Sequence, residues 1–219
     1  ISIAYGGTSI GACNGPVDDC ELDVVASRSQ KGYMIPPGLS FVSMSKKAWQ
    51  ASENSNLPKF YLNLKSYKKS LLSNSNPYTP AVNLVFALDE SLKMMKDEGL
   101  DKIFKRHERH KLAVSEAVKT LNLKLFADEN HLSPAVTAIQ IEDVDAEKFR
   151  KNIKNKYDIL LAGGQDHLKG KIFRVGHLGY INDRDIITVI AAIGNTLVEQ
   201  NIISPETAGK ALKIASYHL

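Results

Sequence analysis

The stretch that decides the fold is SRSQKGYMIPPGLSFV, residues 27–42. It joins two apolar segments, residues 22–26 and residues 39–44, and both have the composition of strands. Pro37-Gly38 suits the central positions of a type II turn, because proline fixes φ and glycine accepts a positive φ. The pattern therefore predicts that Lys31 lies at the edge of a sheet, where an amine can be held for reaction with an aldehyde.

A lysine at the end of a strand is usually only a solvated surface residue, but the longer motif around Lys31 favours a function. The pattern Ser-x-Ser-Gln-Lys-x-x-Met-x-Pro-Pro-Gly-Leu-x-Phe-Val resembles the cofactor-lysine segment of class V (fold type I) pyridoxal-phosphate aminotransferases, in the serine–glyoxylate and alanine–glyoxylate group. The resemblance implies that Lys31 is catalytic and carries pyridoxal 5'-phosphate (PLP), and that Gln30 binds the cofactor phosphate. The implied substrates are an amino acid and a 2-oxo acid.

The start of the chain departs from the family pattern at one cofactor position. Residues 5–12 align with the family segment Asp-Ala-Val-Ser-Ser-x-Gly-Ala, which makes Tyr5 and Gly7 cofactor-binding positions by resemblance. The family aspartate pairs with the protonated ring nitrogen of PLP, and the neutral phenol of Tyr5 cannot replace that charge. Arg28 likewise stands where the family usually has glycine. The resemblance therefore predicts the fold more strongly than it predicts catalysis.

Two further residues are candidates for binding. Thr79-Pro80 is predicted to start a helix that ends at Gly99, with Thr79 as a simple N-cap on local evidence. In the resembling family this turn reaches across a dimer interface to the phosphate of the neighbouring subunit, which implies a homodimer. Arg174 follows a predicted strand and is an exposed arginine on local evidence, whereas the family's Arg-x-Gly-x-x-Gly binds the substrate carboxylate. His177, in the same motif, is predicted to be structural.

The order of elements predicts an α/β fold. Helices are expected at residues 46–51, 80–99, 101–121 and 183–200; a further helix follows residue 141 with Phe149 and Ile153 inward, and a last helix starts at Ser204. Ser45 and Asn182 are predicted N-caps, and the helix at residues 80–99 has an apolar inner face that includes Val82, Val85 and Leu92. Strands are expected at residues 1–5, 136–141, 157–162 and 171–175, while residues 52–77 form a long polar surface segment. The resemblance implies the C-terminal part of a fold type I PLP-dependent transferase, with residues 1–100 in the large domain and residues 101–219 in a small α/β domain. We expect an N-terminal part to be missing and the fragment to be inactive alone.

Composition excludes several other classes of function. No apolar run reaches the roughly 20 residues that span a bilayer and no signal peptide is visible, so a cytoplasmic protein without a membrane partner is expected. Cys13 and Cys20 are predicted to be free thiols, and no cluster of residues suits a metal ion. The net charge is only +4, and the densest basic segment, residues 102–111, is interpreted as the solvated face of a predicted helix. No nucleic-acid partner is therefore expected.

A second hypothesis comes from the segment GYMIPPGLSFV, residues 32–42. It is similar to cyanobacterial family members that have been labelled the small, tritium-exchange subunit of a soluble hydrogenase. This resemblance implies a non-catalytic or accessory subunit with a hydrogenase partner. Two cysteines cannot build a nickel–iron site or an iron–sulfur cluster, so the label would describe association.

Overall fold

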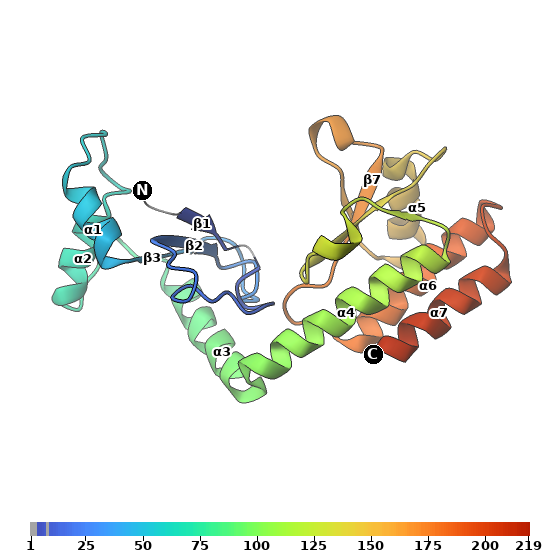
Figure 1. The fold of residues 1–219 in the computed structure, drawn as a ribbon, viewed down its shortest axis with the longest axis horizontal. Helices are drawn as coiled ribbons and strands as arrows, with labels where there is room; N and C mark the ends of the chain where they lie inside the picture. The colour runs from blue at the N-terminus through green and yellow to red at the C-terminus, as the bar shows by residue number, and fades with distance from the viewer. Residues whose placement is uncertain (1–3, 8) are drawn as a thin grey trace. The chain divides into compact units, whose positions relative to one another are not determined.

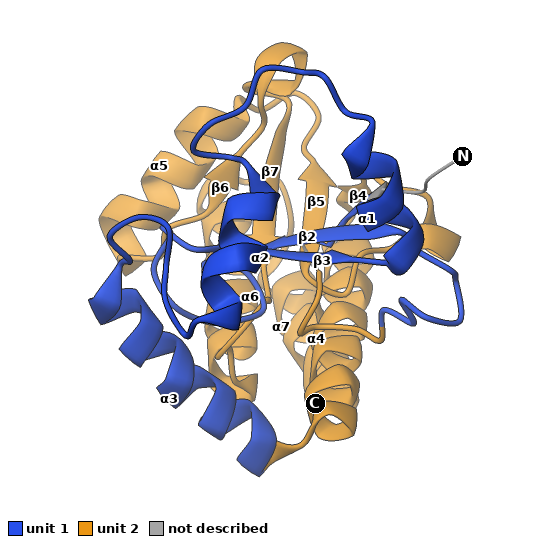
Figure 2. Ribbon diagram, turned by 90° about the vertical axis from the view of Figure 1, so that its left-hand side faces the viewer, with its two compact units in different colours: residues 1–8, 15–97 blue, residues 9–14, 98–219 orange. Residues whose placement is uncertain are grey.

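The computed structural model describes residues 4–7 and 9–219 and divides the chain into two compact units (Figure 2). Unit 1 comprises the described residues up to 7 together with residues 15–97, and unit 2 comprises residues 9–14 and 98–219. Assigning these units to a PLP-binding large domain and a small domain stays a prediction.

Unit 1 is built on a three-stranded mixed sheet (Figure 1). Its order is β1 (Ala4–Gly6), β2 (Val24–Arg28) and β3 (Ser40–Met44), with β1 parallel and β3 antiparallel to β2. The strand predicted for residues 1–5 is therefore described only from residue 4, and its first three residues lie outside the described part. The prediction for β3 is confirmed, whereas β2 begins two residues later than expected and extends to Arg28. The Lys31 segment thus starts directly from a strand.

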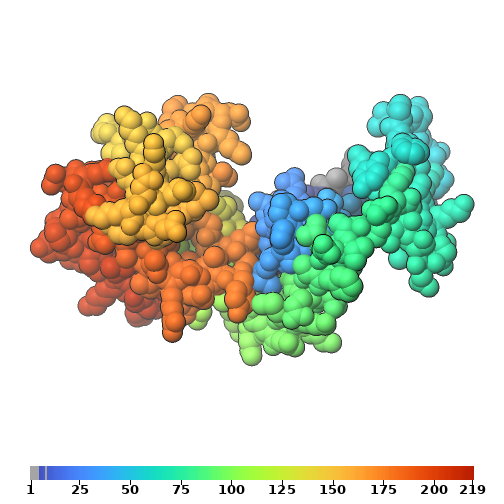
Figure 3. Space-filling view, turned by 180° about the vertical axis from the view of Figure 1, so that it is seen from behind, coloured from blue at the N-terminus to red at the C-terminus, as the bar shows by residue number. Residues whose placement is uncertain are grey.

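The described residues of unit 1 also form three helices, one of which the sequence did not predict. Ser45 caps α1 (Lys46–Glu53) by accepting a hydrogen bond from the Ala48 amide, as expected. The prediction of a plain surface segment over residues 52–77 was wrong in part, because α2 (Leu64–Leu72) lies within it. This helix buries none of its residues, and Figure 3 shows the segment at the surface (cyan). The helix was not predicted because serine and lysine residues interrupt its amphipathic pattern.

The start of α3 (Val82–Glu98) corrects another prediction. The helix begins at Val82, three residues after Thr79, and the Ala81 carbonyl accepts the first helical hydrogen bond, from the Val85 amide (3.1 Å). Pro80 lies outside the helix, in a tight turn in which its carbonyl accepts from the Val82 amide. Thr79 is therefore not the N-cap, although the predicted end at Gly99 is confirmed by its φ of +85°.

Unit 2 carries a four-stranded antiparallel sheet with helices packed against it (Figure 1). The sheet order is β4 (Lys124–Leu125), β5 (Val136–Gln140), β7 (Ile172–Gly176) and β6 (Ala162–Gly163). The helices are α4 (Leu100–Thr120), α5 (Ala146–Tyr157), α6 (Asp183–Glu199) and α7 (Pro205–His218), with short 3₁₀ turns η1 (Glu129–His131) and η2 (Asp166–Leu168).

The core of unit 2 lies between this sheet and its helices. Helices α4, α5 and α6 contact the sheet or one another, and α7 packs on α4 and α6. Phe149 on α5 and Phe173 on β7 are fully buried, with ring centroids 5.2 Å apart. Other buried side chains of this core include Val114, Val118, Leu121, Ile139, Ile153, Ile186, Ile190, Ile193 and Leu197. This apolar cluster fixes the position of β7 and so of Arg174.

One strand prediction in unit 2 was largely wrong. Tyr157 belongs to α5, which ends where Asp158 adopts the left-handed conformation (φ +54°). Only Ala162–Gly163 of the predicted strand at residues 157–162 pairs with a neighbour, in the short strand β6. The apolar run serves burial instead, since Leu161 is 4% exposed.

Three further observations concern membrane spans, cysteines and metal ligands in the described residues. None of the helices described is long and apolar enough to cross a bilayer. Cys13 and Cys20 are free thiols. In residues 4–7 and 9–219, no group of three or more histidine, cysteine, aspartate or glutamate side chains is arranged to hold a metal ion.

Candidate functional site

The segment that carries Lys31 is fixed by the side chain of Ser29. The fully buried Ser29 hydroxyl donates to the Pro36 carbonyl (2.8 Å) and accepts from the Leu39 amide (3.2 Å). The Ser29 backbone amide also donates to the Leu39 carbonyl (3.1 Å). One buried serine therefore closes both ends of the excursion between β2 and β3.

The turn geometry differs from the type II turn predicted at Pro37-Gly38. The Leu39 amide, which would close that turn on the Pro36 carbonyl, is bound by Ser29 instead, and Gly38 has a φ of +142°. A Cβ atom at Gly38 would also lie 2.5 Å from a methyl group of Leu84 on α3. Glycine is required here by its backbone angle and by the close approach of α3.

The tip of the segment is tied to α3 as well. Met34 adopts a left-handed conformation (φ +60°), which is costly for a residue with a Cβ atom. Buried Ser91 on α3 donates its hydroxyl hydrogen to the Tyr33 carbonyl. These bonds hold residues 31–35 in one conformation against the rest of unit 1.

Lys31 itself is half-buried, and its backbone carbonyl accepts from the Met34 amide (3.0 Å). No hydrogen bond or ion pair joins the Lys31 ammonium group to another described residue. Gln30 next to it is exposed. The arrangement combines a rigid backbone with an amine that is not committed to a carboxylate, which suits an amine that must react.

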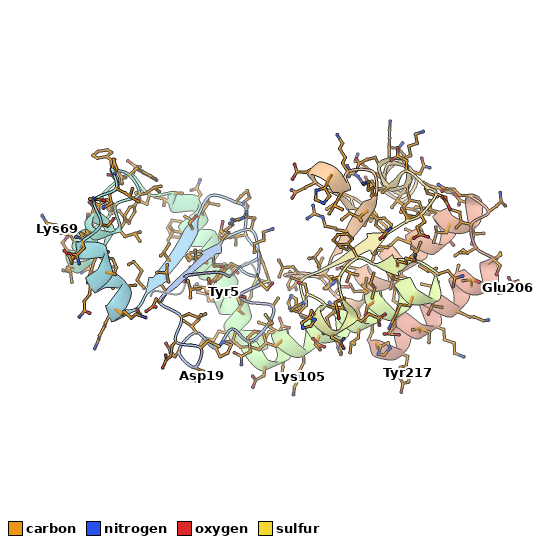
Figure 4. The ribbon with its side chains drawn as sticks, turned by 45° about the horizontal axis from the view of Figure 1, so that its top comes forward. Tyr5, Asp19, Lys69, Lys105, Glu206 and Tyr217 are labelled. Atoms are coloured by element: carbon orange, nitrogen blue, oxygen red, sulfur yellow. The ribbon has the colours of Figure 1, made fainter. Side chains whose placement is uncertain are left out.

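Two other predicted cofactor residues lie beside the strand that leads to Lys31. Tyr5 on β1 pairs with Val25 on β2 and is 45% exposed; Figure 4 labels its side chain. Gly7 is buried, donates its amide hydrogen to the Ala26 carbonyl (2.7 Å) and accepts from the Ser27 hydroxyl (2.9 Å). The structure thus brings Tyr5 and Gly7 to the same sheet as the Lys31 segment.

Thr79 also belongs to unit 1, but none of the contacts described joins it to Lys31. It is exposed and precedes α3. A separate cavity of about 440 Å³ lies in this unit, between β3, α1 and α2, and it includes Trp49 with the Lys68 ammonium 4.4 Å from its ring centroid. None of the predicted site residues lines this cavity.

Arg174 lies in unit 2, on β7. Phe173 and Val175 on either side of it are buried in the core, so Arg174 projects from the opposite face of the sheet. Its partners across the two neighbouring strands are small, Ala138 on β5 and Ala162 on β6. The Arg174 Nε–H donates to the Gly163 carbonyl (3.0 Å), which orients the guanidinium and leaves its two terminal nitrogens available for a carboxylate.

Gly163 on β6, the strand that pairs with Arg174, and Gly164 directly after it have little room for a side chain. We expect Gly164→Ala to destabilise unit 2 by about 2–4 kcal/mol, because its Cβ atom would lie 2.1 Å from the backbone oxygen of Leu168. Gly163→Ala is the matched control, since its Cβ atom meets only the ends of the Glu147 and Arg150 side chains, which can move. Urea unfolding measures the difference, and equal losses in the two variants would contradict the prediction.

Three buried histidines surround the end of β7. The His177 ring bonds Thr137 through Nε2 (2.9 Å) and the Pro134 carbonyl through Nδ1 (3.0 Å), which confirms a structural role. Burial lowers the pKa of His177 to about 4, although its bond to Pro134 acts in the opposite direction. Burial also lowers the pKa values of His107 and His110 on α4. All three side chains are therefore neutral at neutral pH.

Comparison with known proteins identifies the family. A family model described as aminotransferase class-V matches residues 7–179, a range that includes Lys31, Thr79 and Arg174. The chain belongs to the class V aminotransferase family. The resemblance first recognised in residues 27–42 is thereby confirmed, and the family is PLP-dependent.

Relatives of this class V aminotransferase chain carry two kinds of name. The soluble hydrogenase 42 kDa subunit of Anabaena cylindrica is 57% identical over 192 residues, which cover 88% of this chain and 50% of that protein. The L-aspartate–glyoxylate aminotransferase of Paracoccus denitrificans is 34% identical over 215 residues, covering 97% of this chain and 54% of that protein. The chain spans about half the length of the curated relatives it matches.

The α/β fold is also that of a solved relative. The crystal structure of ureidoglycine–glyoxylate aminotransferase from Bacillus subtilis matches with a TM-score of 0.89 and 26% sequence identity. The match covers 98% of this chain and 58% of that one. This chain therefore has the α/β fold of about half of a fold type I PLP aminotransferase.

Several residues that shape the site were missed by sequence reasoning. Ser29 lies inside the recognised motif, but nothing local indicates that it bridges Pro36 and Leu39. Arg106 and His107 lie in a basic segment that was interpreted only as a solvated helix face, yet His107 is 1% exposed. The sequence does contain a signal for the burial of these histidines. His107 and His110 are three residues apart on a predicted helix, on the same side as Ile103 and Val114.

Proposed function

We propose that the protein to which this chain belongs is a soluble-hydrogenase-type small subunit that keeps the PLP-binding lysine of a glyoxylate-type aminotransferase. The 57% identity to the Anabaena cylindrica subunit supports the first part of the proposal. The rigid segment that presents Lys31 supports the second. The two parts are compatible, because an accessory role in an assembly does not require the loss of a cofactor site.

The retained lysine segment is the observation that carries the PLP proposal. When bound, PLP supplies an aldehyde that condenses with amines and a ring that accepts electrons. Lys31 would hold the aldehyde carbon through its Nζ atom and would move the proton of the substrate's Cα atom. Gln30 would bind the cofactor phosphate, and Gly7 would contact the cofactor. Thr79 would bind the cofactor phosphate of a partner subunit, and Arg174 would hold the substrate carboxylate.

One position does not fit the cofactor. Tyr5 offers a phenol where the family has an aspartate, so the residue that would balance the charge of a protonated ring nitrogen is missing. Without that charge the ring is a weaker electron acceptor. We therefore propose that the protein binds the cofactor through Lys31 but transfers amino groups slowly, which agrees with a mainly accessory role.

The homodimer implied by the resemblance and the cytoplasmic location expected from composition are part of the same proposal. Large apolar side chains of unit 1 remain exposed, and Phe60, Leu62, Leu71 and Leu72 are each at least 72% exposed. The predicted inner face of α3 is also half-exposed at Val82, Val85 and Leu92. Surfaces of this kind are typical of protein interfaces, and a second copy of the protein would cover them.

Two preparations of the protein, one expressed alone and one from the native organism, test both parts of the proposal. The protein expressed from its complete coding sequence should be yellow, and borohydride should bleach its absorbance band and add the mass of one reduced cofactor per chain. If the accessory role is correct, an iron–sulfur partner should co-purify from the native organism and be absent from a preparation expressed alone. Size-exclusion chromatography of the latter measures the dimer.

The possible outcomes separate the two parts. Colourless protein that borohydride leaves unchanged in mass would exclude the PLP proposal and leave only the accessory role. Yellow protein that turns over an amino acid and glyoxylate rapidly, and that has no partner in its native extract, would exclude the accessory role. The aminotransferase function would then stand alone.

A further inference from the structure

The chain that follows Arg174 is held by side chains from α4. We refer to residues 177–182, between β7 and α6, as the post-β7 loop. The Arg106 guanidinium donates from Nη1 to the carbonyls of Gly179 (2.9 Å) and Ile181 (3.0 Å). Its other side binds both carboxylate oxygens of Glu98, at 2.7 and 3.0 Å. Glu98 therefore orients the Arg106 guanidinium, and the Nη1 group of Arg106 holds the loop.

His107 makes the third bond to this loop, and the bond has a defined direction. The His107 Nδ1–H donates to the Ile103 carbonyl (2.8 Å), and Nε2 accepts the Gly179 amide hydrogen (3.0 Å). A neutral imidazole has one donor and one acceptor, so these two contacts specify the tautomer that carries its proton on Nδ1. A backbone N–H can only donate. A proton on Nε2 would therefore place two donors against each other at this bond.

The loop cannot easily relieve that conflict. Gly179 has a φ of +89°, a conformation that glycine adopts freely, and it is buried. His107 is 1% exposed, so water cannot replace the lost acceptor without opening the structure. Loss of this bond should loosen the loop and, through it, the end of β7.

The charges around His107 mostly favour its neutral form. On its own helix it faces Arg106 and His110, and the end of α3 contributes Glu98. His110 donates from Nε2 to Asp183 on α6 (2.8 Å), to which Arg109 also donates. The His110 Nδ1 atom has no hydrogen-bond partner among the described residues. Of the loop's own residues, His177 is titratable, and charge on His110, His107 or Lys111 lowers its pKa further. Burial is the main reason that the pKa of His107 lies below its usual value of 6.5. The hydrogen bond to Ile103 and the Glu98 charge raise that pKa, whereas the Arg106 charge, and His110 when it is protonated, lower it further.

We propose that neutral His107 is a positioning residue that holds the post-β7 loop in place, and that its protonation releases the loop and so weakens binding of a carboxylate at Arg174. The part that concerns Arg174 rests on the proposed function. The part that concerns the loop rests only on contacts within unit 2. Because the folded protein favours the neutral ring, the loop is held at neutral pH and is released as the pH falls below the lowered pKa.

The test measures hydrogen exchange of the loop as a function of pH. Peptides that cover residues 177–182 are followed by mass spectrometry in the protein expressed from its complete coding sequence, from about pH 7.5 to about pH 4.5, with rates corrected for intrinsic exchange. We expect protection of the loop to fall at least about tenfold on acidification while protection of the buried core of α6 is kept. Ending the series above pH 4 limits the contribution of His177.

Two glutamine variants make the test specific. In His107→Gln the side-chain oxygen can accept the Gly179 amide hydrogen near the position of Nε2 but cannot titrate, so the acid-induced loss should disappear. His110→Gln alters a buried histidine on the same helix and should leave that loss unchanged. An acid-induced loss that persists in His107→Gln, or is absent from the unaltered protein, overturns the inference; the second criterion applies even if the variant does not fold.

Binding of glyoxylate, measured by calorimetry over the same pH range, tests the link to Arg174. The dissociation constant should rise at least about tenfold on acidification in the unaltered protein and stay constant in His107→Gln. If the loop opens as expected but binding does not change in step with it, the role of Arg174 in the proposed function is overturned, whereas the inference about the loop stands.

Discussion

Lys31→Ala is expected to abolish covalent attachment of the cofactor and to reduce amino-group transfer by at least about 10³-fold. Alanine leaves no amine to condense with the cofactor aldehyde or to move the Cα proton. The backbone of the segment should be unaffected, because it is held by Ser29 and Ser91 rather than by the Lys31 side chain. After treatment with borohydride, the variant should show the mass of the polypeptide alone.

Lys46→Ala provides the control for this experiment. Lys46 is an exposed lysine at the start of α1, and its replacement also removes one amine from unit 1. It should keep the absorbance band and the mass increase. If Lys31→Ala still acquires the cofactor's mass under borohydride, another amine carries the cofactor and the proposed role of Lys31 is wrong.

Phe173→Ala should cause the largest loss of stability, about 3–5 kcal/mol. Phe173 is fully buried, stacks on Phe149 and occupies the strand position next to Arg174. Removing the ring leaves a cavity between α5 and the sheet that the surrounding residues cannot fill. The midpoint of urea unfolding should fall accordingly, and binding of carboxylates should weaken because β7 shifts.

Phe126→Ala is the matched control for Phe173→Ala. Phe126 follows β4 and is 48% exposed, so its truncation should cost less than about 1 kcal/mol. A loss of stability in Phe126→Ala that equals the loss in Phe173→Ala would show that burial in the α5–β7 core does not determine the effect. Urea titrations of both variants followed by circular dichroism decide between these results.

Local chemistry explains most of the predictions that were confirmed. Ser45, Asn182 and Ser204 each accept amide hydrogens at the start of the helix that follows them, and Asn182 forms a full capping box with Asp185. Such signals act over three or four residues and can be found in the sequence alone. The predicted start of α3 was wrong because a tight turn at Pro80 competes with a cap at Thr79. Both structures use the same local residues.

The sequence by itself determined the resemblance to the family, the lysine proposed to hold the cofactor, the departure at Tyr5 and the periodicity that buries Phe149 and Ile153. It could do so because a long motif and a helical repeat are properties of neighbouring residues. Only the tertiary structure decided that Ser29 closes the Lys31 segment on Pro36 and Leu39, that Ser91 on α3 binds its tip, and that His107 accepts the Gly179 amide 72 residues away. These bonds depend on which elements pack together, and packing is set by the whole core rather than by local sequence.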